Sequence, residues 1–164
     1  MMGDDAEGVR QAIYRYARGV DRLDPGLIAG AFWPDARVTL GTIYDGGPDG
    51  FVEVAMNFMG MFAATRHDVG NIVLAQDGDS MGYEAYVRTW HWHEAAGSEL
   101  EVLGRYIGRA EKRAGEWRLA EHGELMDWGE ERPINSAWFA ANAELEKGQR
   151  SRADGSYRWL PAPG

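Results

Sequence analysis

Apolar residues recur at helical spacing in three segments of the first half of the chain. Residues 6–20, 27–32 and 49–64 are each predicted to form a helix. The turn signal Asp24-Pro25-Gly26 precedes the second helix, and Asp49 is expected to cap the third. One face of the first helix is apolar and is expected to point towards a core: Val9, Ala12, Ile13, Tyr16, Ala17 and Val20.

Alternating apolar and polar residues then predict strands over most of the remaining chain. The predicted strands span residues 37–43, 65–74, 80–93, 100–110 and 116–125. Turn signals separate them, including Asp45-Gly46-Gly47-Pro48 after the first strand and Asp77-Gly78-Asp79 after the second. Helices followed by a mostly antiparallel run of strands predict an α+β fold in which one curved sheet wraps around the helices.

The C-terminal part has a different character. A last helix is predicted over residues 135–147, followed by a tail over 148–164 that contains Tyr157 and Trp159. Large aromatic rings gain from burial, so we expect the tail to pack on its own domain or on a neighbouring subunit. Residues 1–164 have a length typical of a single domain.

Composition narrows the function. The chain has 17 Lys and Arg against 26 Asp and Glu, a net charge of −9, and no cysteine. Disulfides, thiol nucleophiles, zinc ribbons and iron–sulfur sites are therefore excluded. The acidic balance argues against nucleic acid or an anionic membrane surface as the main partner. The N-terminal residues lack the order of a signal peptide, so we expect a soluble, cytoplasmic protein.

General acid–base chemistry is what the remaining motifs allow. The chain has no Gly-x-Ser-x-Gly, phosphate-binding loop or His-Glu-x-x-His motif. All four histidines lie in the predicted strand region. His67 begins a strand, and Asp21 at the end of the first helix is a candidate to orient its ring and fix its tautomer. The alternative is that His67 is structural and that Asp21 pairs with a neighbouring arginine on the surface.

The other histidines allow more than one interpretation. His91 and His93 are two residues apart on one strand, so they point to the same face and resemble the start of a cupin metal site. Glu94 or Glu99 would then add a carboxylate, and His122 would replace the missing later histidine. The alternative for the pair is a structural or strand-end role, and we expect no metal and no cofactor. His122 is either an exposed strand residue or a functional one.

The ordered motifs resemble a known family. They are Tyr14-Arg15-Tyr16-Ala17-Arg18-Gly19-Val20-Asp21, Phe32-Trp33-Pro34-Asp35-Ala36, Thr65-Arg66-His67 and Gly115-Glu116-Trp117-Arg118-Leu119. Together they resemble the SnoaL-like branch of the nuclear transport factor 2-like superfamily, which is similar to scytalone dehydratase, hexachlorocyclohexane dehydrochlorinase and bile-acid dehydratase. The resemblance spans residues 6–128.

The resemblance implies a fold and a set of roles. The fold would be a conical α+β barrel with a deep apolar pocket and no cofactor. His67 would take a proton from carbon, Asp21 would orient it, and Tyr16 would contact substrate or act as an acid. Two departures stand out. Leu40 occupies the place of a tyrosine that Tyr44 would have to replace, and His122 occupies the place of an arginine and would be a second acid–base group.

The resulting hypothesis is a cofactor-independent lyase that acts on a hydrophobic, aromatic small molecule. Either dehydration or a retro-aldol loss of an aldehyde fits it. The catalytic residues would be His67, Asp21 and His122. The alternatives are an isomerase, a polyketide cyclase or a non-catalytic binding module, and the chain is expected to form a homo-oligomer, either a dimer or a trimer. The substrate-binding residues would be Tyr16, Tyr44, Trp33 and His91.

Overall fold

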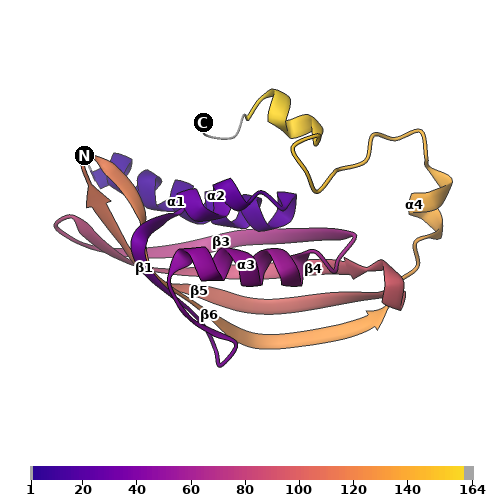
Figure 1. The fold of residues 1–164 in the computed structure, drawn as a ribbon, viewed down its shortest axis with the longest axis horizontal. Coiled ribbons are helices and arrows are strands. Elements are labelled where there is room, and N and C mark those ends of the chain that lie inside the picture. Colours follow the sequence, from indigo (N-terminus) through magenta and orange to yellow (C-terminus); the bar gives the residue numbers. More distant parts are fainter. Residues whose placement is uncertain (1, 161–164) are drawn as a thin grey trace.

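Helices and sheet form two layers. The structure, a computed structural model, describes residues 2–160. Its three main helices are α1 (Met2–Arg22), α2 (Pro25–Gly30) and α3 (Pro48–Met59). All three lie on one face of the sheet (Figure 1). No helix within residues 2–160 is long and apolar enough to cross a membrane.

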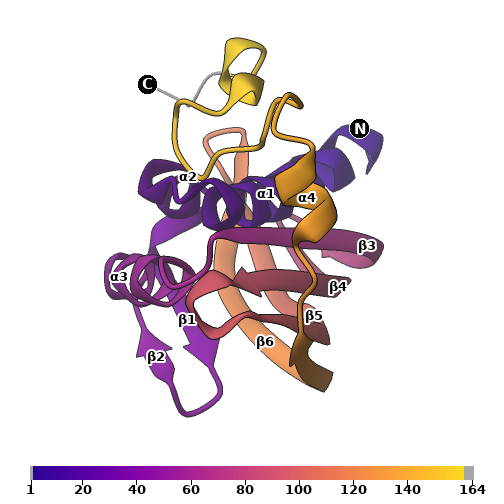
Figure 2. The same ribbon diagram turned by 90° about the vertical axis from the view of Figure 1, so that its right-hand side faces the viewer.

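One curved sheet of six strands supports the helices. Its order is β2-β1-β6-β5-β4-β3, and all neighbours are antiparallel except β1 and β6, which are parallel. The sheet bends around the helices without closing into a barrel (Figure 2). The predicted α+β architecture is therefore confirmed. The strands are β1 (Phe32–Leu40), β2 (Tyr44–Gly46), β3 (Ala64–Asp77), β4 (Ser80–His93), β5 (Ser98–Arg113) and β6 (Glu116–Pro133).

The core lies on the concave side of the sheet. The predicted apolar face of α1 is buried, and alternate residues of β4 from Met81 to His91 point inwards to meet it. Pairing shifts in β3, β5 and β6 accompany the curvature of the strands. Curvature and alternation together place inward-pointing side chains of β3 and β6 around one interior space.

Several predicted boundaries around the first strand are wrong. The second helix ends at Gly30, because Phe32 already pairs with Leu119 in the sheet. The chain turns at residues 41–43 rather than at 45–48, since the amide of Ile43 donates to the carbonyl of Leu40. Asp45 and its neighbours then pair with β1, so the strong turn signal marks the end of a hairpin and not its bend.

The later helices also differ from the predictions. Gly47 caps α3, and Asp49 lies inside the first turn, because Pro48 already occupies the first helical position. The helix ends at Met59 rather than at residue 64. Only Ala137–Ala141 is helical in the segment predicted as a long last helix. β6 continues to Pro133, beyond the predicted end of the last strand at residue 125.

The C-terminal tail passes over the outer side of α1 and α2 (Figures 1 and 2). The Tyr157 hydroxyl donates to Asp24 at 2.7 Å, and Arg22 forms an ion pair with Asp154 at 3.0 Å. Trp159 remains 82% exposed. The tail therefore contacts its own chain through Tyr157, whereas Trp159 faces away from the core.

Candidate active site

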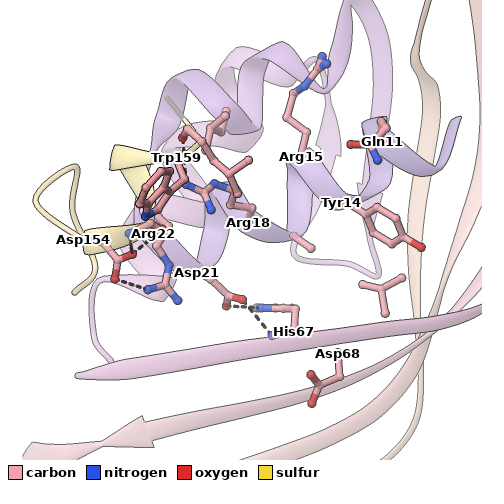
Figure 3. A pocket seen from close by; sticks show the side chains of 15 residues that line it. Gln11, Tyr14, Arg15, Arg18, Asp21, Arg22, His67, Asp68, Asp154 and Trp159 are labelled. Carbon is pink, nitrogen blue, oxygen red and sulfur yellow. Dashed lines mark hydrogen bonds and ion pairs between the residues drawn. The ribbon is translucent and has the colours of Figure 1, made fainter. Parts of the chain in front are cut away.

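His67 and Asp21 lie in direct contact. The Nδ1 atom of His67 is 2.7 Å from Oδ1 of Asp21, and the His67 amide donates to Oδ2 at 3.0 Å. The Thr65 hydroxyl donates to Oδ1 at 2.8 Å. The end of α1 thus supplies the carboxylate, and the first residues of β3 supply the imidazole and two further donors (Figure 3).

The contact favours the ionised form of Asp21. Burial opposes ionisation of Asp21, but the hydrogen bonds from His67 and Thr65 outweigh it and hold the pKa of Asp21 below its usual value. An ionised Asp21 accepts the Nδ1 proton of His67, which leaves Nε2 as the ring nitrogen outside this contact. Within residues 2–160 no hydrogen bond occupies that Nε2 atom.

His67 borders an apolar cavity of about 280 Å³. The cavity lies between the concave face of the sheet, α1 and α3, and apolar side chains form most of its wall. Its polar members are few, so each is a candidate for orienting a ligand. Those with titratable or hydroxyl side chains are Tyr16, His67, Thr89, His91, Arg105, Tyr106 and Glu124.

A second, wider groove lies on the other side of α1. It has a volume of about 1030 Å³, is open to solvent and is lined by the outer face of α1 and by the tail, including Arg18 and Trp159 (Figure 3). It also reaches Asp21 and His67 from outside. An apolar ligand gains more from the cavity than from this groove, because apolar side chains form most of the cavity wall.

Glu124 is a cavity residue that the sequence analysis missed. Its Oε1 atom accepts a hydrogen bond of 2.6 Å from the Tyr16 hydroxyl. Burial opposes its ionisation, but His122 and Tyr16 outweigh that effect and lower the pKa of Glu124. Glu124 follows His122 by two residues on β6, so strand alternation places both side chains on the same face of the sheet. This spacing is the sequence signal that could have identified Glu124.

His122 does not line this cavity, and its catalytic role stays a prediction. Its side chain is fully buried against the rings of Tyr16, Phe32 and Tyr106. Its Nδ1 atom is 2.7 Å from the Tyr83 hydroxyl, and Nε2 is 3.6 Å from Oε1 of Glu124. Tyr16, Tyr106 and Glu124 contact or face His122 and line the cavity, so these side chains separate His122 from it.

His91 does line the cavity, as expected for a substrate-binding residue. Its ring stacks on Phe62 at 4.8 Å and lies 5.5 Å from the ring of His67. Burial, with a smaller contribution from His67, lowers its pKa to about 4. Residues 2–160 contain no group of three His, Asp or Glu side chains arranged to hold a metal, so no third ligand joins His91 and His93 there.

Trp33 and Tyr44 lie outside the cavity wall. The Trp33 indole donates to the carbonyl of Glu111 at 3.0 Å, and two arginine side chains lie over its ring. The Tyr44 hydroxyl donates to the carbonyl of Gly47. Leu40 and Ile43 occupy the wall instead, because the chain turns before Tyr44 and directs it towards α3.

Solved structures with the same fold are numerous. A type 2 hexachlorocyclohexane dehydrochlorinase has a TM-score of 0.73 and 21% identity, covering 79% of this chain and 90% of that one. A candidate scytalone dehydratase from Novosphingobium aromaticivorans has a TM-score of 0.71 and 16% identity, covering 79% and 89%. A type 3 dehydrochlorinase from Novosphingobium barchaimii has a TM-score of 0.71 and 19% identity, covering 77% and 89%.

At these identities the likeness concerns the fold alone. The sequence matches no curated protein at a significant level. The family model of the SnoaL-like domain, in contrast, matches residues 3–122. This match covers most of the chain, including Asp21 and His67, and the protein therefore belongs to the SnoaL-like domain family.

Proposed function

We propose that the protein is a cofactor-independent lyase that acts on a small hydrophobic ring compound. The observation that carries the proposal is the free Nε2 atom of His67, a residue that lines the apolar cavity and is held by Asp21 through Nδ1. This arrangement is suited to removing a proton from a carbon atom. Two solved structures with the same fold are named as a dehydratase and a dehydrochlorinase. Loss of water or of HCl to form a double bond removes a proton from a carbon atom.

In the proposed reaction, His67 takes the proton at Nε2 and becomes an imidazolium. Asp21 holds the Nδ1–H tautomer and stabilises the new charge. His91 is close by but neutral at pH 7, since its pKa is about 4, so it does not repel that charge. Apolar walls exclude water from the reacting carbon and strengthen the Asp21–His67 interaction.

The cavity constrains the substrate. Its volume of about 280 Å³ lies near the lower end of ligand pockets, which span roughly 300–1,000 Å³. A molecule of one or two rings fits this volume better than a larger polycyclic molecule. An isomerase or cyclase would use the same proton abstraction without a leaving group, and a binding module would use the cavity alone.

The test is turnover of two ring compounds that carry different leaving groups, scytalone and hexachlorocyclohexane. In His67→Gln, we expect loss of water or chloride to fall about 100-fold or more, the usual contribution of a general base. His93→Gln is the matched control, since it removes a histidine that lies outside the cavity wall. Equal activity of His67→Gln and the wild type would contradict the proposal.

We also propose that the chain self-associates through the outer face of the sheet. Tyr86, Leu103 and Trp128 are 48%, 38% and 47% exposed there, and Leu103 pairs directly with Trp128 across β5 and β6. Positively and negatively charged side chains flank these residues, including the ion pair of Arg88 with Glu101. An apolar centre with mixed charges at its rim suits a contact between identical copies.

A further inference from the structure

Glu124 places a carboxylate on the wall of a mostly apolar cavity. Its Oε1 atom accepts a hydrogen bond of 2.6 Å from the Tyr16 hydroxyl, and Nε2 of His122 lies 3.6 Å from the same oxygen. Within residues 2–160 no hydrogen bond reaches the other oxygen, Oε2. The side chain lies deep in the protein, yet 28% of its surface is accessible, because it borders the cavity.

The surroundings make Glu124 an acceptor of hydrogen bonds. Burial opposes its ionisation, but His122 and Tyr16 outweigh this effect and hold the pKa of Glu124 below its usual value. At pH 7 it is a carboxylate, whose oxygens accept hydrogen bonds and donate none. An acceptor without a partner in apolar surroundings is costly, and a donor on a ligand would relieve that cost at Oε2.

The charges around the cavity restrict the kind of donor. Arg105 is the only Lys or Arg among the described residues that line it. Its guanidinium donates to Asp127 at 2.9 and 3.1 Å and to Glu84 at 3.0 Å, so two carboxylates already balance its charge. A carboxylate on the ligand would meet the like charge of Glu124. An ammonium would match that charge, but both ions would lose water, whereas a hydroxyl donates without being an ion.

The position of Glu124 complements that of His67. Glu124 is on β6 and His67 is on β3, and β5 and β4 lie between them in the sheet. Because the sheet curves, both side chains nevertheless reach one cavity (Figure 2). A ring that Glu124 holds at one edge can therefore present another of its atoms to His67.

We propose that Glu124 is a specificity-determining residue that selects ring compounds carrying a hydroxyl group, which donates to Oε2. Compounds with a carboxylate or a carbonyl at that place are rejected. The inference rests on the proposed lyase function, for which it names the substrate class. The bound hydroxyl is not the group that leaves, because a hydrogen bond donated to a carboxylate makes its oxygen richer in electrons and a poorer leaving group. The leaving group therefore lies elsewhere on the ring.

Three compounds with one skeleton test this selection. At the same position 2-indanol carries a donor, 2-indanone only an acceptor and indane neither. For the wild type, we expect the dissociation constant of 2-indanol to be about tenfold or more below the other two, the usual effect of a hydrogen bond to a charged group. In Glu124→Gln, the amide oxygen still accepts from Tyr16 and the amide nitrogen becomes a donor to the ligand. The preference should then reverse in favour of 2-indanone, as NMR titration of the ¹⁵N-labelled protein measures.

The matched control is Glu121→Gln, which removes the same charge from the same strand but at an exposed position. It should keep the preference of the wild type. Equal affinities of the wild type for 2-indanol and indane, or an unchanged preference in Glu124→Gln, would overturn the role of Glu124. The ammonium of 2-aminoindane should bind more weakly than 2-indanol, and tighter binding would overturn the assignment of a hydroxyl.

A readout in the wild type needs no variant that has to fold. The ¹³C signal of the Glu124 carboxylate should shift when 2-indanol binds and stay in place with indane. No shift at saturating 2-indanol would overturn the inference. Because binding is measured rather than turnover, His67→Gln should keep the preference for 2-indanol. If His67→Gln retained full turnover of the lyase substrates, the lyase function would fail while the selection by Glu124 would stand.

Discussion

At the scale of single residues, the site combines imidazoles in different environments. His67 is paired with a carboxylate, whereas His91 stacks on Phe62 and its Nδ1 atom has no hydrogen-bond partner. Asp21, His67 and Arg150 are the charged or titratable groups that act most strongly on His91, and Glu124 contributes less. Burial outweighs them all, so His91 resists protonation in the folded state.

A pH dependence of stability follows from His91. Its pKa is about 4 in the folded protein against 6.5 for an unperturbed histidine, so the unfolded chain binds the proton first as the pH falls. The free energy of unfolding should therefore decrease between pH 6.5 and 4, by about 3 kcal/mol at most. Urea titrations measure it. His91→Phe keeps a ring on Phe62 and should flatten the slope, and parallel curves for both proteins would contradict the assignment.

At the scale of elements, Arg150 connects three segments. Its guanidinium donates to the carbonyls of Val20 and Asp21 at the end of α1, at 3.1 and 3.2 Å. It also donates to the carbonyls of Met59 and Phe62 after α3. Burial lowers the pKa of Arg150, yet the group is satisfied by carbonyls that a helix end leaves without partners. Arg150 therefore connects the end of α1, which carries Asp21, to the segment after α3, which places Phe62 on His91.

Replacing Arg150 should destabilise the fold. In Arg150→Met, the buried carbonyls lose their donor, and we expect a loss of about 3 kcal/mol in the free energy of unfolding. Chemical denaturation measures this loss. The control is Arg158→Met, because Arg158 forms an exposed ion pair with Glu146, which contributes about 0–1 kcal/mol. A similar effect of both substitutions would show that the tail is not anchored by Arg150.

At the scale of the whole molecule, the sheet has two faces with different roles. The concave face holds the core and the cavity, and the outer face exposes Trp128 beside Leu103. If identical copies meet there, sedimentation velocity should show a dimer or trimer, and Trp128→Arg should give a monomer. Trp138→Arg is the control, since Trp138 is 68% exposed but lies on α4. A wild-type monomer would contradict the proposed interface.

The sequence by itself determined the α+β class and the type of most helices and strands, and it predicted that Asp21 pairs with His67. Periodicity is a local property, so the buried face of α1 and the alternation of β4 could be predicted from neighbouring residues. Asp21 and His67 were predicted as a pair from their residue types, and the family resemblance supported the pair; they are in contact. Boundaries failed where a pairing partner from elsewhere in the chain extended a strand, as at Phe32 and Pro133.

Only the tertiary structure decided which side chains share the cavity. Glu124 and His67 are far apart in sequence and on strands that are not neighbours, so their common cavity depends on the curvature of the whole sheet. The same curvature buries His122 behind Glu124, and the turn at residues 41–43 directs Tyr44 away from the cavity. Sheet curvature and long-range register arise from contacts across the entire chain, and no local pattern of residues encodes them.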